Sequence, residues 1–168
     1  MVRQVHGATV VVADRVAHLG EADAIVTATP GVPIAVRVAD CAPIALEADG
    51  VVGVVHAGWR GLVAGVIPAT IEVMRDLGAA DIRAVLGPCI HAECYEWQPD
   101  DLDRVAGALG EGVRGTTSWG TPALDVPAAV RAQLPGVEVV GGCTACSRDH
   151  WSHRARGEDE RQAVVAWI

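Results

Sequence analysis

The strongest constraint on the fold is a series of short apolar runs rich in Val, Ala and Ile, separated by Gly, Pro and charged residues. Several runs are apolar at successive positions, which is typical of strands that are buried on both faces of a sheet. The sequence therefore predicts several largely buried strands. They are expected at Val2–Ala13, Ala22–Thr29, Ile34–Ala48, Val51–Ala57, Ile82–Leu86, Val137–Gly141 and Gln162–Ile168.

Helical periodicity appears between these runs. Apolar residues recur at helical spacing from Leu62 to Leu77, and the pattern stops at Gly78. Asp101–Leu109 and Pro127–Leu134 predict two shorter helices. The chain has 168 residues, 51% of them hydrophobic, with no linker or repeat, so it can bury one core. We therefore expect an α/β (α+β) protein: one domain over the whole chain, a sandwich of mixed β-sheets flanked by helices.

Charge and composition exclude several function classes. A net charge of −8 argues against a nucleic-acid partner, because such proteins usually present a basic face to the phosphates. No apolar run approaches the roughly 20 residues of a membrane-spanning helix, so no membrane role is expected. The five cysteines form an odd set, and the chain begins without a signal peptide. These features favour a reducing compartment, the cytoplasm.

Three residues that carry chemistry close or interrupt apolar runs: His6, Cys41 and His56. Their spacings of 35 and 15 residues exclude a zinc-finger loop but suit a site built from several strand ends. Two imidazoles and one thiolate would leave a fourth metal position open, as in catalytic zinc sites. The residues alone leave two alternatives: Cys41 as a nucleophile activated by His6 or His56, and ordinary buried side chains.

The segment that follows His56 runs from a predicted strand into a predicted helix through Gly58-Trp59-Arg60-Gly61. Free N–H groups at the start of a helix and the Arg60 guanidinium together form a common anion site. A tight turn with Arg60 as a surface charge explains the same pattern. The sequence leaves these two interpretations equal.

Six motifs occur in a fixed order and together resemble the YfiH-type family, which is labelled polyphenol oxidase or laccase-domain and, more recently, purine nucleoside phosphorylase. The resemblance covers nearly the entire chain, and the block that begins at His56 is the most specific of the six. The motifs are Gln4-Val5-His6-Gly7, Ala39-Asp40-Cys41-Ala42-Pro43, His56-Ala57-Gly58-Trp59-Arg60-Gly61, Gly87-Pro88-Cys89-Ile90 with Cys94-Tyr95-Glu96, Leu124-Asp125-Val126 and Ser152-His153-Arg154.

The resemblance implies a zinc ion held by His6, Cys41 and His56 and an enzyme that acts on purine nucleosides and phosphate. The same two imidazoles and thiolate would also accept copper as a substitute, because Cu(II) binds such ligands more tightly than zinc does. Family members are described as phosphorolysing adenosine, inosine, guanosine and methylthioadenosine, and as deaminating adenosine. Zinc would polarise a water or substrate oxygen. Beyond the ligands, the residues expected to act are Arg60 and, less strongly, Arg154 for phosphate, Asp40 or Glu96 for proton transfer, and Trp59 beside the substrate.

The sequence departs from the family at both ends. Relatives usually carry a further segment before the Gln-Val-His-Gly motif, so the domain is expected to be N-terminally truncated. Near the other end, Arg161 is expected to replace the last arginine of the family pattern. His91 stands where a small residue is common, so it is either an extra ligand or an exposed side chain.

Other functions remain open at this level. A cysteine hydrolase using Cys41, in cell-wall peptide editing, and a non-catalytic metal-binding module are the alternatives of a different class. True copper oxidase chemistry is least favoured, because six histidines and two methionines are too few for its copper clusters. Cys143 and Cys146 suggest a redox pair or a four-thiolate zinc site with Cys89 and Cys94, but packing is the simpler interpretation. The oligomeric state is not predicted.

Overall fold

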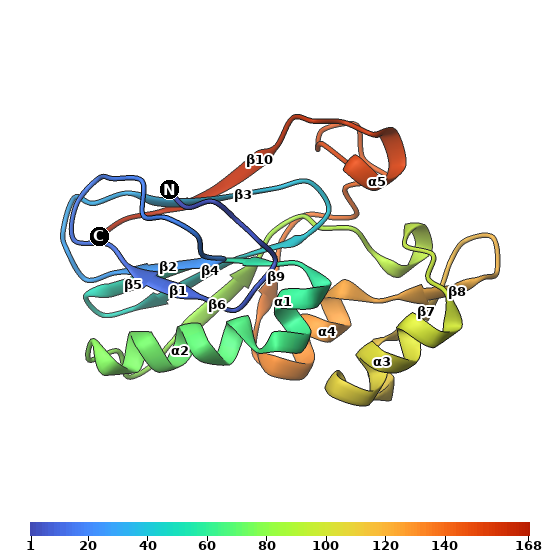
Figure 1. Ribbon diagram of the computed structural model, residues 1–168, viewed down its shortest axis with the longest axis horizontal. Helices are drawn as coiled ribbons and strands as arrows, with labels where there is room; N and C mark the ends of the chain where they lie inside the picture. Colours follow the sequence, from blue (N-terminus) through green and yellow to red (C-terminus); the bar gives the residue numbers. More distant parts are fainter.

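The computed structural model describes residues 1–168 and places a six-stranded mixed sheet between a two-stranded ribbon and a layer of helices (Figure 1). The strand order in the sheet is β1-β2-β5-β4-β6-β9. β1–β2 and β6–β9 are parallel pairs, and the other neighbours are antiparallel. The predicted mixed α/β class is therefore confirmed. The six strands are β1 (Val10–Val12), β2 (Ala24–Thr27), β4 (Ala42–Ala48), β5 (Val51–Ala57), β6 (Arg83–Leu86) and β9 (Glu138–Val139).

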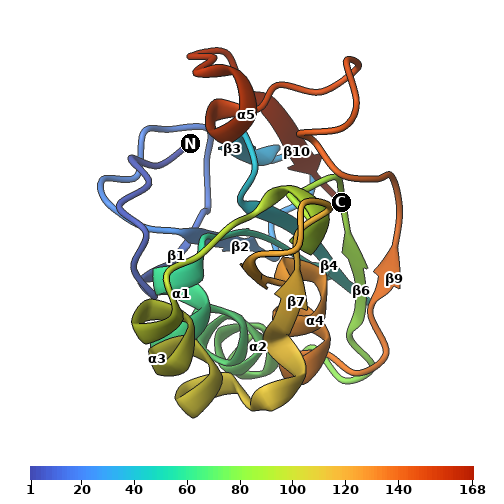
Figure 2. The ribbon, with the colours of Figure 1, turned by 90° about the vertical axis from the view of Figure 1, so that its right-hand side faces the viewer.

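The ribbon and the helices cover opposite faces of this sheet (Figure 1). β3 (Ile34–Val38) pairs antiparallel with β10 (Gln162–Ala166) to form the ribbon, and β7 (Arg114–Thr116) pairs with β8 (Pro122–Leu124) at one end of the molecule. Figure 2 shows α5 beside the ribbon, on the side away from the other helices. The helices are α1 (Trp59–Ala64), α2 (Val66–Asp76), α3 (Pro99–Leu109), α4 (Val126–Gln133) and α5 (His153–Arg156), with short 3-10 helices η1 (Ala92–Cys94) and η2 (Glu111–Val113).

Each layer boundary has its own apolar core, and strand alternation explains why. In β5, Val51 and Val55 belong to the large cluster on the helical side, whereas Val52 and Val54 belong to the smaller cluster under the ribbon. Successive side chains of a strand point to opposite faces. His56 continues the even-numbered series, so it lies on the face that the ribbon covers.

The two longest helices have 11 residues each, and no helix in the structure combines the length and apolarity that crossing a membrane requires.

The predicted first strand, Val2–Ala13, is wrong over most of its length. Only Val10–Val12 form a strand, and a single bridge joins Arg3 to Glu21. The N–H groups of Val5, His6 and Gly7 instead donate to a carboxylate, so they are not available to a neighbouring strand. Side-chain chemistry overrides the apolar pattern here.

Two other predicted elements are each divided. The run Ile34–Ala48 becomes β3 and β4, which lie in different sheets, because the chain turns at Asp40 with a positive φ of 85°. The helix predicted from Leu62 to Leu77 breaks at Gly65, whose φ of 83° ends α1 and starts α2. Glycine adopts this left-handed conformation without steric cost.

Candidate metal centre

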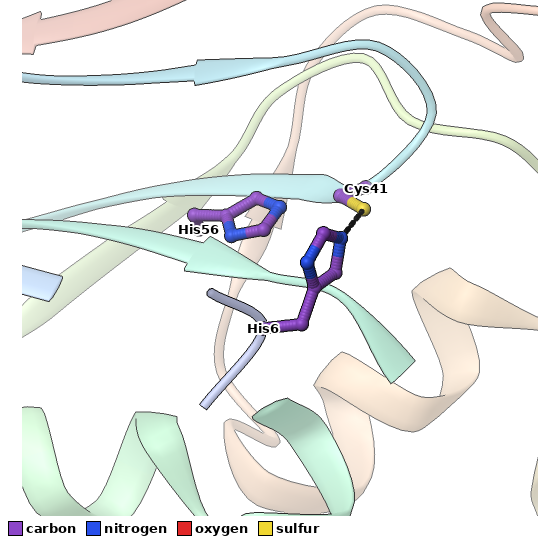
Figure 3. A group of neighbouring side chains, drawn as sticks. All are labelled: His6, Cys41 and His56. Carbon is purple, nitrogen blue, oxygen red and sulfur yellow. Dashed lines mark hydrogen bonds between the residues drawn. The ribbon is translucent and has the colours of Figure 1, made fainter. Parts of the chain in front are cut away.

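His6, Cys41 and His56 converge at one end of the central sheet, as Figure 3 shows. His6 lies in the loop before β1, Cys41 immediately precedes β4, and His56 is the penultimate residue of β5. Their ligand atoms all lie within 4.8 Å of one another, and His6 Nε2 is 3.7 Å from Cys41 Sγ. His56 is buried, Cys41 is half-buried and His6 is exposed. The site is therefore open to solvent on the side of His6.

A buried carboxylate, Asp23, organises this group. Asp23 Oδ1 is 2.7 Å from His56 Nδ1 and accepts a hydrogen bond from the His6 N–H at 2.9 Å. Asp23 Oδ2 accepts from the N–H groups of Val5 and Gly7 at 3.3 and 2.7 Å. The contact with Nδ1 leaves Nε2 of His56 as the ligand atom. The same carboxylate holds the loop at His6, whose φ is 61°, in a left-handed conformation.

The side chains of this group shift one another's pKa values. Burial raises the pKa of the Cys41 thiol, but hydrogen bonds and charge from His56 and His6 outweigh it and bring the pKa to about 7. Burial lowers the pKa of His56, but hydrogen bonds and charge from Asp23 and Cys41 outweigh it and raise the pKa to about 9. Burial also raises the pKa of Asp23, but its hydrogen bonds to His56 and the backbone lower it overall. The cluster therefore favours thiolate at Cys41, the form that binds metals.

Gly58 explains part of the motif that follows His56. A Cβ at this position would stand 2.6 Å from His6 Cδ2 and 3.2 Å from Cys41 Sγ. A separation of 2.6 Å between such carbon atoms is far inside van der Waals contact, so a side chain here would push His6 out of place. The turn into α1 thus passes close to two of the three side chains because it carries none of its own.

The donor set fits a zinc ion. Zinc binds imidazole nitrogen at about 2.0–2.1 Å and thiolate sulfur at about 2.3 Å, so a nitrogen and a sulfur around one tetrahedral ion lie roughly 3.6 Å apart. The His6–Cys41 distance of 3.7 Å agrees with this value. Asp23 on His56 provides the carboxylate–histidine pairing that orients metal ligands. Two imidazoles with one thiolate also suit copper, so the donor set does not select between these metals.

Asp40 links the turn at Cys41 to the C-terminal part of the chain. Asp40 Oδ1 accepts from Thr144 Oγ1, and Oδ2 accepts from the Arg154 N–H, both at 2.6 Å. The Asp40 backbone carbonyl accepts from the Ile90 N–H at 2.9 Å. Asp40 is only 7% exposed, so its two carboxylate oxygens are committed to these donors. This arrangement fixes the backbone beside Cys41.

A cavity of about 270 Å³ opens beside the three ligand residues. Three arginines, Arg3, Arg37 and Arg161, are among the residues that line it. Arg3 pairs with Glu21, and Arg161 donates to two backbone carbonyls, whereas the Arg37 side chain forms no hydrogen bond or ion pair with the protein. Arg37 and Arg161 therefore carry positive charges at this cavity that no carboxylate of the chain pairs. Its lining residues are Val2, Arg3, Gln4, His6, Arg37, Val38, Ala39, Cys41, His56 and Arg161.

Gln4 holds the two walls of this cavity together. Its side-chain Nε2 donates to the Arg37 carbonyl at 2.6 Å, and its Oε1 accepts from the Arg37 N–H at 2.9 Å. This double contact resembles one step of a β-ladder and attaches the loop of His6 to β3. The Gln-Val-His-Gly motif thereby places His6 and Arg37 on one cavity.

Aromatic side chains lie on the opposite side of Cys41. Trp59 and Tyr95 line a small cavity there with Cys41, and Trp97 contacts both rings edge to face. The Arg60 guanidinium lies 4.3 Å from the centre of the Trp59 ring, and that of Arg154 lies 4.9 Å from the Tyr95 ring. Such distances correspond to cation–π contacts. Arg60 and Arg154 therefore lie over the aromatic group and line neither cavity.

Glu96 is farther from the metal ligands. It is exposed, lines neither cavity, and accepts a hydrogen bond from Trp119 Nε1 at 3.0 Å. His91 lies 3.6 Å from Glu93 and is not among the three clustered ligand residues. Neither Glu96 nor His91 belongs to the group of three ligand residues, so the proton-transfer role of Glu96 and the ligand role of His91 stay predictions.

Sequence reasoning missed Asp23, Gln4 and Arg37. A signal for Asp23 was available, because an aspartate inside the run Ala22–Thr29 has to be paired or exposed. Gln4 stands two residues before a candidate ligand, but no pattern indicates that it contacts the backbone of Arg37. Arg37 has no local signal at all, since its position in the cavity depends on the turn at Asp40.

Comparison with known proteins is consistent with this geometry. The family described as multi-copper polyphenol oxidoreductase laccase matches residues 1–168. The chain belongs to this family. A curated member of Streptomyces griseus, purine nucleoside phosphorylase ORF3, is 43% identical over 98% of this chain and 72% of its own length. A purine nucleoside phosphorylase of Streptomyces coelicolor is 41% identical over 98% of this chain and 73% of its own length.

Solved structures of this laccase-like family have the same fold. YlmD from Geobacillus stearothermophilus is 30% identical, with a TM-score of 0.82 over 96% of this chain and 70% of that one. A Neisseria meningitidis protein is also 30% identical, with a TM-score of 0.84 over 98% of this chain and 72% of that one. Another match is YfiH from Bacillus licheniformis, with a TM-score of 0.82 at 28% identity. The resemblance found from the motifs is therefore confirmed.

Proposed function

We propose that this chain is a zinc-dependent purine nucleoside phosphorylase. The observation that carries the proposal is the convergence of His6, Cys41 and His56 on an arginine-lined cavity. Its relatives named purine nucleoside phosphorylase, up to 43% identical, support the same reaction class. The proposed substrates are adenosine, inosine, guanosine and methylthioadenosine, each with phosphate, and adenosine deamination is a second proposed activity. Function in the cytoplasm would keep Cys41 reduced.

In this proposal, three residues bind the metal and neighbouring carboxylates position them. His6, Cys41 and His56 hold the zinc ion, which when bound supplies Lewis-acid polarisation of a water or substrate oxygen. Asp23 fixes the tautomer of His56 and the loop of His6. We assign Asp40 a positioning role, because both of its carboxylate oxygens are occupied. Glu96 lies with Trp119 at the rim, and a proton-transfer role for either carboxylate stays a prediction.

Phosphate is proposed to bind on the ribbon side of Cys41. Phosphorolysis joins a phosphate oxygen to the ribose carbon that releases the purine, so the phosphate has to lie beside the reacting bond. Arg37 and Arg161, which line the cavity that the metal ligands share, are the proposed source of positive charge for this phosphate. The purine is proposed to lie toward Trp59 and Tyr95, on the other side of Cys41. Arg60 and Arg154, which the sequence suggested as phosphate-binding residues, are the alternatives to Arg37 and Arg161.

Replacing Arg37 with alanine should raise the KM for phosphate by roughly 10-fold or more, because a charge-assisted hydrogen bond contributes about 1.5–3 kcal/mol. The zinc content should not change, since Arg37 contacts no ligand residue through its side chain. Initial-rate kinetics at varied phosphate and saturating inosine measure this. Arg60→Ala is the rival variant, and Arg75→Ala, an exposed arginine on α2, is the control. A larger phosphate defect in Arg60→Ala than in Arg37→Ala would move the phosphate site to the start of α1.

The direct test of the proposal combines metal analysis with an enzyme assay on one sample. The chain is purified without chelator or added metal, its zinc is measured, and hypoxanthine release from inosine and phosphate is followed. We expect bound zinc and phosphate-dependent release, with activity lost after dialysis against a chelator and restored by zinc. Zinc without turnover of any purine nucleoside would favour a metal-binding module instead of an enzyme.

One second candidate function has an observation in its favour. Asp23, His56 and Cys41 are arranged in the order carboxylate, imidazole and thiol, which is the order of a cysteine hydrolase triad. His6 has no role in such a triad, and its position against Cys41 Sγ favours metal binding. Chelation separates the two candidates, because a cysteine hydrolase acting on cell-wall peptides would keep its activity without metal.

A further inference from the structure

A second group of sulfur atoms shares no residue with the first site. Cys94 ends η1, and Cys143 and Cys146 lie in the segment after β9. Their sulfur atoms all lie within 4.8 Å of one another, and the Cys94 and Cys146 sulfurs are 3.3 Å apart. Cys89, the fifth cysteine, is not a member of the group. All five cysteines are free thiols.

The backbone around these residues builds a defined sulfur pocket. The segments of Cys89 and Cys143 meet in a parallel bridge, and the Thr144 N–H donates to the Cys89 carbonyl at 3.0 Å. The His91 N–H donates to Cys143 Sγ at 3.4 Å, and the Ser147 N–H donates to the Cys143 carbonyl at 3.1 Å. The His91 N–H therefore fixes the position of the Cys143 sulfur.

We propose that Cys94, Cys143 and Cys146 bind a second zinc ion, with a structural role. Thiolates around one zinc ion lie about 3.8 Å apart, and the three sulfurs, with one pair 3.3 Å apart and every pair within 4.8 Å, are close enough to share one ion. A Cys-x-x-Cys turn joined by a third cysteine from elsewhere is a common arrangement of structural zinc ligands. Glu93, whose Oε1 lies 3.8 Å from Cys146 Sγ but outside the group of three sulfurs, is the proposed fourth ligand.

A disulfide explains these positions less completely. A bond between Cys94 and Cys146 would use two of the three sulfurs and leave Cys143, which is buried and receives the His91 N–H, without a partner. The packing role expected from the sequence does not account for Cys146, which is exposed. A metal ion uses all three sulfurs at once.

The proposed ion would connect two segments beside the first site. Thr144 lies between two of its ligands, and its hydroxyl donates to Asp40, the residue before Cys41. Zinc at the three cysteines would therefore hold the turn that contains Thr144. Through the Thr144 hydroxyl, this turn would hold Asp40 in place. None of the three cysteines lines either cavity at the first site, so the ion is assigned no part in the reaction.

The test counts zinc in the intact chain after purification without chelator or added metal. We expect two zinc ions per chain in the parent, one in Cys146→Ser, one in Cys41→Ala and none in the double variant. Cys146 is exposed, so its serine variant should fold, and far-ultraviolet circular dichroism checks this. Cys89→Ala is the matched control that removes a neighbouring thiol and should keep both ions.

Cobalt distinguishes the two sites spectroscopically. Thiolate-to-cobalt charge-transfer absorption scales with the number of thiolate ligands, so the site left in Cys41→Ala should absorb more strongly than the site left in Cys146→Ser. Equal zinc content in the parent and Cys146→Ser would overturn the proposal. A Cys94–Cys146 disulfide in the purified chain, with no second zinc taken up after reduction, would also overturn it. Neither result bears on the first site, which Cys41→Ala tests separately.

Discussion

Cys41→Ala should release the zinc of the first site and lower purine nucleoside phosphorolysis by more than about 100-fold. Substitutions that affect only the orienting partners of metal ligands already cost roughly 10–100-fold in metal affinity or activity, and this variant removes a ligand itself. The remaining His6 and His56 would offer only two donors. Zinc content falls by one ion per chain in elemental analysis, and hypoxanthine release from inosine falls with it.

Cys89→Ala provides the control for this experiment, because Cys89 is buried in the same region but is not part of the cluster with His6 and His56. Its zinc content and rate should match the parent. Cys41→Ala with unchanged zinc content and full activity would exclude the proposed metal centre. Loss of activity with retained zinc would instead favour Cys41 as a nucleophile.

Asp23→Asn should weaken zinc binding by roughly 10–100-fold, although the side chain keeps its size. The Asp23 oxygens accept four contacts, and an amide in either orientation places its NH₂ against donors. Asp23→Ala removes every acceptor. Breaking a buried pair of this kind costs about 3–5 kcal/mol of unfolding free energy, which corresponds to a fall in Tm of about 10 °C. Zinc titration measures the first effect, and thermal unfolding of metal-free protein measures the second.

The matched control is Asp81→Asn, which makes the same change of charge at an exposed position. Its zinc affinity and Tm should stay within the error of the parent values. The Asn variant separates positioning from folding, because a purely structural role for Asp23 would lower the Tm and leave the zinc affinity unchanged in the folded protein. Zinc affinity within two-fold of the parent in Asp23→Asn would contradict the role assigned to this carboxylate.

The strands and helices of this fold were predictable where local pattern and tertiary environment agree. Val51–Ala57 forms β5 with the predicted bounds, and Pro99–Leu109 extends the predicted helix by only two residues. The prediction failed where a side chain took over the role of the backbone. Asp23 binds the N–H groups of residues 5–7, so an apolar run that resembles a strand folds as a ligand loop. The β7–β8 hairpin was missed because its strands have three residues each.

The candidate ligands were predictable, but their surroundings were not. His6, Cys41 and His56 each stand at an interruption of an apolar run, and the motifs around them are specific. The residues that complete the site depend on long-range contacts: Gln4 meets Arg37 across 33 positions, and Asp40 meets Thr144 across 104. No local pattern encodes such pairings. The four-thiolate alternative contained Cys94, Cys143 and Cys146, but Cys89 could be excluded only from the three-dimensional arrangement.

The contact between Asp40 and Thr144 sets an order of events during protein synthesis. Asp23 and the three ligands of the first site all belong to the first third of the chain, whereas Thr144 leaves the ribosome 104 residues after Asp40. At usual elongation rates of about 5–20 residues per second, this delay is roughly 5–20 s. A nascent chain therefore holds all three ligands well before the residue that fixes the turn at Cys41 exists. On the proposed metal assignment, the ligand set is therefore complete in the growing chain before the contact that locks this turn can form.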